Sequence, residues 1–107
     1  MKILLDHCVP HRFSLSFPSH IVRTTADQGW ERLRNGNLLS AASGEFDVFL
    51  TVDKNLKHEQ NLSTLPIAVV VIMAKSNRLA DLLPFIAAVE EQLACLKPQT
   101  LVEVQLP

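Results

Sequence analysis

The stretch that decides the fold is Phe46-Asp47-Val48-Phe49-Leu50-Thr51-Val52-Asp53. Its short length and its Val, Phe and Leu content predict a buried parallel strand with Asp53 at its C-terminal end. The segment Lys2-Ile3-Leu4-Leu5-Asp6 has the same design, an apolar run that stops at a carboxylate. In open α/β sheets, ligands bind outside the carboxyl ends of the strands. If the two strands are neighbours, Asp6 and Asp53 meet at one edge of the sheet.

The size and composition of the chain predict one globular domain, residues 1–107. A chain of 107 residues is long enough for one domain and too short for two. Hydrophobic residues make up 48% and charged residues 20% of it, so we expect a conventional core and no global disorder. The formal net charge of −1 gives no general attraction to nucleic acid. Binding of RNA would therefore need a local basic face or metal ions.

The chain also carries indications of its location. Two cysteines, Cys8 and Cys95, are too few for a disulfide framework, so we expect a reducing, cytoplasmic environment. The N-terminus lacks a signal-peptide pattern, because polar Asp6 and His7 soon follow the apolar residues after Lys2. No apolar run approaches the length of a membrane span, and no membrane partner is expected.

Further apolar runs predict the remaining strands, at residues 20–24, 67–73 and 101–105. The run at 67–73 is the most apolar in the chain and should be buried on both faces of the sheet. The order of strands and helices predicts a three-layer α/β/α domain with a mostly parallel central sheet. The last strand should lie at an edge, and an antiparallel direction is open for it.

Helices are predicted between these strands. Asn35 is a favourable N-cap and Gly44 a favourable stop for one helix. Residues 54–65 are largely polar and predict a loop or an irregular helix at the functional edge. Apolar residues recur at helical spacing over 79–96. Pro84 either interrupts this last helix or sits in its first turn.

Three segments together resemble a known family. They are the start Lys2-Ile3-Leu4-Leu5-Asp6, the central run from Asp47 to Leu56, and Ser76-Asn77-Arg78 before the leucine-rich helix. In this order and spacing they resemble PIN-like domains, in particular a group of small bacterial PIN-like proteins, over nearly the whole chain. The resemblance implies a Mg²⁺- or Mn²⁺-dependent ribonuclease. It also implies, as for many members, a toxin that pairs with an antitoxin protein.

The resemblance gives Asp6 and Asp53 catalytic and metal-binding roles. One or two Mg²⁺ ions can activate a water and balance the charge of the transition state in phosphodiester hydrolysis. Mg²⁺ prefers oxygen ligands and keeps several waters, so two carboxylates suffice for one ion. Asn35 or Asn37 could add a neutral carbonyl ligand. The alternative is that strand-end aspartates only cap the helices that follow them.

The sequence departs from the family pattern before the central strand. Relatives carry carboxylates there, in a segment such as Asp-Gly-Glu-Leu-Leu, whereas this chain has Asn35-Gly36-Asn37-Leu38-Leu39. His7 and Cys8 also replace the acidic and amide residues that often follow the first aspartate. A second hypothesis therefore stands beside the nuclease: a catalytically degenerate module that binds RNA or a protein partner.

Polar and basic residues follow the predicted strands and could hold phosphates. Lys54 and Asn55 come directly after Asp53, and Asn77 and Arg78 follow the most apolar strand. Further basic candidates for the same edge are Arg32, Arg34, Lys57 and His58. The alternative is a solvated loop in which Asn77 caps a helix.

Other features have more conventional interpretations. His7, Cys8 and His11 would suit Zn²⁺, but their spacing matches no closed zinc site, so a loop histidine and a small buried thiol are the simpler interpretation. Trp30 is expected to anchor a core or an interface rather than to stack on bases. The leucine-rich stripe over 79–96 is expected to pack in the core, with part of it available for a homodimer contact.

Overall fold

The central sheet of the computed structural model has five strands that all run parallel. The structure describes residues 1–106, apart from the side chain of Asn35. The strands are β1 (Lys2–Leu5), β2 (Ile21–Thr24), β3 (Val48–Thr51), β4 (Ala68–Ile72) and β5 (Leu101–Val104), in the order β2-β1-β3-β4-β5. The predicted α/β class with a mostly parallel sheet is confirmed. The antiparallel direction left open for the last strand is wrong, because β5 pairs with β4 in parallel.

The direction of chain growth reverses between β1 and β3. From β1 the chain adds β2 on one side, then crosses to add β3, β4 and β5 on the other. Leu5 pairs with both Thr24 and Leu50, so β1 is hydrogen-bonded on both edges. In open parallel sheets, the crevice at such a switch point is where ligands bind. A ligand is therefore expected beside the residues that follow β1 and β3.

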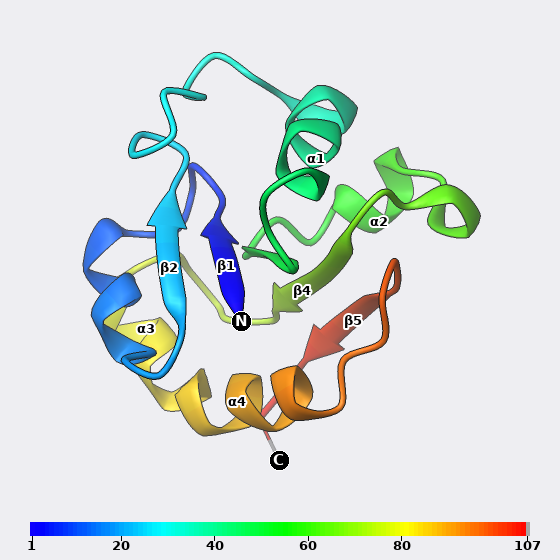
Figure 1. Ribbon diagram of the computed structural model, residues 1–107. Coiled ribbons are helices and arrows are strands. Elements are labelled where there is room, and N and C mark those ends of the chain that lie inside the picture. The colour runs from blue at the N-terminus through cyan, green and yellow to red at the C-terminus, as the bar shows by residue number, and fades with distance from the viewer. Residues whose placement is uncertain (107) are drawn as a thin grey trace.

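Helices cover both faces of the sheet, giving three layers (Figure 1). One face packs under α1 (Asn35–Ser43) and α2 (Leu56–Glu59), with Leu4, Leu39 and Phe49 in its core. The other packs under η1 (His11–Ser16), α3 (Leu79–Leu82), η3 (Leu83–Phe85) and α4 (Ile86–Ala94). Ile3 and Leu5 face this second layer. The alternation of Ile3, Leu4 and Leu5 shows why an uninterrupted apolar strand suits a sheet covered on both sides.

The helices differ in detail from the sequence expectations. Pro84 interrupts the stretch over 79–96, which is divided into α3, η3 and α4, because proline cannot donate a backbone hydrogen bond. The N-cap of α1 is Arg34, whose backbone is extended, so the assignment of Asn35 as the cap is wrong by one residue. The side chain of Asn35 lies outside the described part of the structure. No helix within residues 1–106 is long and apolar enough to cross a membrane.

Candidate active site at the β1–β3 switch point

The structure brings Asp6, Asp53 and Asn77 together in one cavity. Its volume is about 380 Å³, and Cys8 and Val52 are among the other residues that line it. Asp6 follows β1 directly, and its backbone N–H donates to the carbonyl of Leu50 in β3 at 3.0 Å. This bond extends the β1–β3 pairing by one step. Both aspartates are half-buried, and their carboxylates therefore remain accessible to a ligand in the cavity.

Thr51 joins the two aspartates. Its side chain is fully buried, and its Oγ1 donates to Asp6 Oδ2 at 2.7 Å. The same oxygen accepts the backbone N–H of Asp53 at 3.0 Å. A single hydroxyl thus fixes one carboxylate and the backbone that carries the other. Sequence reasoning missed this role, and the only indication was a hydroxyl residue at the last position of an apolar strand.

Each aspartate also accepts a backbone hydrogen bond from a nearby residue. Asp6 Oδ1 accepts the N–H of His7 at 2.7 Å, and Asp53 Oδ1 accepts the N–H of Asn55 at 3.0 Å. The second contact is an Asx turn that leads into α2. The capping alternative for Asp53 is wrong, because the N-cap residue of α2 is Asn55 and no side chain caps this helix. The Asx turn occupies one carboxylate oxygen of Asp53, and a carboxylate has two.

Replacing Thr51 by valine should lower the free energy of unfolding by about 1–3 kcal/mol. Valine has nearly the same shape, but Asp6 Oδ2 then loses its hydroxyl donor and keeps only the weak thiol donor of Cys8, and the N–H of Asp53 loses its acceptor. Urea denaturation of the two proteins measures this difference. Thr64→Val is the control, because Thr64 is exposed and its hydroxyl makes only a long hydrogen bond of 3.5 Å. Equal stabilities for the two variants would contradict the role of Thr51.

His7 is held by the protein through both ring nitrogens. Its Nδ1 lies 2.9 Å from Thr25 Oγ1, and its Nε2 lies 3.0 Å from the carbonyl oxygen of Leu33. An Arg34 guanidinium nitrogen is also 3.1 Å from Nε2. His11 lies in η1 and lines a different cavity from His7. The zinc alternative is thus not supported, because the ring nitrogens of His7 already have protein partners.

The thiol of Cys8 is a poor nucleophile in this position. Burial, followed by the nearby negative charge of Asp6, raises the pKa of Cys8 above its usual value. Its Sγ lies 3.5 Å from Asp6 Oδ2 and 3.7 Å from Thr51 Oγ1. Because the thiolate is the reactive form, a raised pKa lowers reactivity at neutral pH. Cys8 is better described as a wall of the cavity.

A smaller cavity, of about 110 Å³, adjoins Asp6 and Asp53 under α1 and α2. It brings in Arg34, one of the basic residues expected at this edge, and Glu59, a carboxylate that sequence reasoning missed. Glu59 is exposed at the end of α2. Its indication in the sequence was a carboxylate six positions after Asp53, in a segment whose helical form was left open. The wall of this cavity thus contains three carboxylates and one guanidinium, although the three carboxylates are not close enough together to hold a metal ion as a group.

The other predicted site residues are dispersed. Asn77 Nδ2 donates to the carbonyl of Cys8 at 2.9 Å, so Asn77 braces the cavity wall and does not cap a helix. Arg78 is the N-cap residue of α3 and is exposed. Asn37 and Asn55 are exposed, and neither is among the residues that line the two cavities. Lys54 lines a separate pocket. The predicted ligand Asn37 is therefore not brought beside Asp6 and Asp53.

Fold and site define an α/β domain with a parallel sheet and a carboxylate-lined cavity at its switch point. Within residues 1–106, no three His, Cys, Asp or Glu side chains are close enough together to hold a metal ion on their own. Neither a family model, nor a curated protein, nor a solved structure matches the chain. Any assignment of function therefore depends on the chemistry of the residues and on the resemblance of the sequence segments.

Proposed function

We propose that the chain is a PIN-like ribonuclease that hydrolyses RNA with Mg²⁺ or Mn²⁺. The observation that carries the proposal is the pair Asp6 and Asp53 lining one cavity, tied together through Thr51. Oxygen donors are what these ions prefer, and an ion that keeps several waters can be held by one or two carboxylates. The donor set thus fits a weakly held ion. When bound, the ion supplies an activated water and positive charge at the phosphate.

The residues of the chain have distinct roles in this proposal. Asp6 and Asp53 hold the ion, and Thr51 keeps Asp6 in place through its 2.7 Å hydrogen bond. Arg34 lines the smaller cavity with the same carboxylates. One of its guanidinium nitrogens already donates to the carbonyls of Glu31 and Leu33, and its other donors can bind a phosphate oxygen. Asn77 orders the Asp6–Cys8 loop through the Cys8 carbonyl. None of these roles requires Asn37.

The biological setting follows from the resemblance alone. It favours a toxin in the cytoplasm that acts on cellular RNA and is held inactive by an antitoxin protein. A homodimer contact through part of the 79–96 segment belongs to the same proposal. Within that segment, Leu83 is 45% exposed, whereas Leu82 is fully buried. Only the exposed members of the stripe are available for such a contact.

A second candidate function is a degenerate module that binds RNA or a protein without turnover. The observation in its favour is the position of Asn37, which is exposed and outside both cavities. Glu59 is exposed as well and is not close enough to complete a three-ligand group. This candidate predicts no metal-dependent cleavage and RNA binding that survives loss of either aspartate.

A calorimetric titration with Mn²⁺ tests the proposed site. The wild type should bind weakly, and Asp53→Asn should lower the affinity by at least the roughly 10–100-fold typical of losing a supporting residue. Glu91→Gln is the control, because it removes one exposed carboxylate from α4 and none from the cavity. No binding by the wild type, or equal binding by both variants, would contradict the metal site and favour the second candidate.

A further inference from the structure

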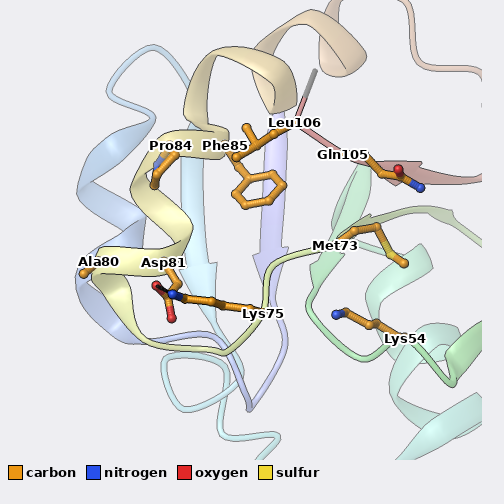
Figure 2. A pocket seen from close by; sticks show the side chains of 9 residues that line it. All are labelled: Lys54, Met73, Lys75, Ala80, Asp81, Pro84, Phe85, Gln105 and Leu106. Carbon is orange, nitrogen blue, oxygen red and sulfur yellow. Dashed lines mark ion pairs between the residues drawn. The ribbon is translucent and has the colours of Figure 1, made fainter.

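The function above does not use a second, larger pocket of the chain, which shares no lining residue with the candidate active site. Its volume is about 600 Å³, within the roughly 300–1,000 Å³ typical of small-molecule sites. It lies between the residues that follow β4 and β5 and the α3–η3 segment (Figure 2). Lys54, the residue directly after Asp53, contributes to its wall. A lining residue of this pocket, Lys54, is thus the chain neighbour of Asp53, which lines the carboxylate cavity.

The polar part of the pocket is positively charged. It contains two lysines, Lys54 and Lys75, against one carboxylate, Asp81. Lys75 Nζ is 3.8 Å from Asp81 Oδ1, and the Lys75 side chain is 85% exposed, so this pair holds it only weakly. The other oxygen of Asp81 accepts the hydroxyl hydrogen of Ser76. Part of the negative charge of Asp81 is therefore already satisfied. Figure 2 shows the Lys75 side chain directed toward Asp81 and away from Lys54, so an anion from solution meets Lys54 first, and the exposed Lys75 side chain can turn toward it.

The rest of the pocket is apolar. Phe85 is 5% exposed and is drawn in Figure 2 beside Leu106, with Met73 across the pocket. Leu106 is 47% exposed, which leaves much of an apolar side chain uncovered at the rim. The amide of Gln105 adds a donor and an acceptor next to this surface. A ligand that suits the pocket carries both a flat apolar group with polar edges and a negative charge.

We propose that this pocket binds one nucleotide of a single-stranded RNA. This nucleotide is the neighbour of the phosphodiester bond that is cleaved at the Asp6–Asp53 cavity. The base lies against Met73 and Leu106, over the buried ring of Phe85, and the phosphate meets Lys54, with the exposed Lys75 turned toward it. Base contacts of this kind tolerate any sequence, because every base has an apolar face. An acidic peptide would satisfy the lysines but leave the apolar surface empty. The inference rests on the proposed function and specifies its substrate as single-stranded.

The test measures binding in EDTA, so that it does not depend on a metal ion. Fluorescence anisotropy of a labelled hexaadenylate is measured with the wild type and with Lys54→Gln/Lys75→Gln. We expect the double variant to bind about tenfold more weakly, with a salt slope smaller by about 0.7 for each phosphate that no longer meets a lysine. Arg12→Gln/Lys97→Gln is the control, because it removes the same charge from exposed positions outside the pocket.

A second variant tests the apolar surface without touching the core. Leu106→Asp places a carboxylate at the rim, and it should weaken binding about as much as the loss of a stacked base, roughly tenfold. Leu62→Asp is the control, since Leu62 is equally exposed at 47% and is not part of this pocket. Unlabelled adenosine monophosphate should compete better than inorganic phosphate, because only the nucleotide uses both parts of the pocket.

The outcomes separate this inference from the proposed function. Weaker binding by both pocket variants, with unchanged controls and with Asp6→Asn still binding, supports the nucleotide pocket. Absence of binding by the wild type, or equal binding by all variants, overturns it. If the pocket variants cleave RNA in Mn²⁺ with unchanged KM, the nucleotide-binding role of the pocket is contradicted and the proposed ribonuclease activity is supported. Binding at the pocket without any cleavage in Mn²⁺ supports the pocket and overturns the nuclease.

Discussion

Asp6→Asn should reduce Mn²⁺-dependent RNA cleavage by roughly 100-fold or more, the usual cost of removing one group that stabilises the transition state. The neutral amide no longer attracts a cation, although its oxygen can still accept a hydrogen bond. The fold should survive, because the Thr51 hydroxyl can either donate to or accept from an amide at this place. Loss of activity would then reflect chemistry at the switch point rather than unfolding. Single-turnover cleavage of a labelled RNA measures the effect.

Asp47→Asn is the matched control for this experiment. Asp47 lies at the opposite end of β3, and its Oδ2 accepts the backbone N–H of Lys2 at 2.7 Å. It therefore resembles Asp6 in accepting a backbone hydrogen bond at the end of a strand. It lies, however, where the strands begin, at the end of the sheet opposite to the candidate site. Cleavage should be unchanged in Asp47→Asn. Equal activity in wild type and Asp6→Asn would show that the cleavage comes from another site or another protein.

Parts of the sheet could be predicted from sequence because burial leaves a strong pattern. β1, β3 and β4 are covered on both faces, so nearly every residue in them is apolar and the runs stand out. The position of Asp6 and Asp53 follows from the same pattern, since parallel strands end at one edge. That β1 and β3 are neighbours was a condition of the prediction, and the structure meets it. The strand order itself leaves no trace in a single sequence.

The parts that could not be predicted depend on contacts between distant segments. Thr51 joins the aspartates only because β1 and β3 pair in the observed register. Glu59 reaches the site only because residues 56–59 form a helical turn after a polar loop. Asn37 was assigned by its place in a segment, yet its side chain is exposed on α1 and not in the cavity. The sequence thus predicts which helix or strand a residue belongs to, whereas the direction of its side chain depends on how that element packs.

In the segment η1, too, the sequence does not show which side chains are buried. Substitutions in η1 can measure how much this burial adds to the free energy of unfolding. Phe13, Leu15 and Phe17 alternate in the sequence as if they shared one face. In the structure, Phe13 and Phe17 are fully buried, with ring centroids 5.2 Å apart in an edge-to-face contact. Leu15 points away and is 79% exposed. Three apolar residues of similar size thus differ greatly in the area that they remove from water.

Phe13→Ala should therefore lower the free energy of unfolding by about 3–5 kcal/mol, because it opens a cavity and removes the partner of Phe17. Leu15→Ala should change it by less than about 0.5 kcal/mol, since the leucine is already in water. Urea denaturation measures both, and an unchanged slope would show that the unfolded states are comparable. A loss of this size is a large part of the roughly 5–15 kcal/mol that holds a domain folded. Equal shifts for the two variants would contradict the packing of η1 on the sheet.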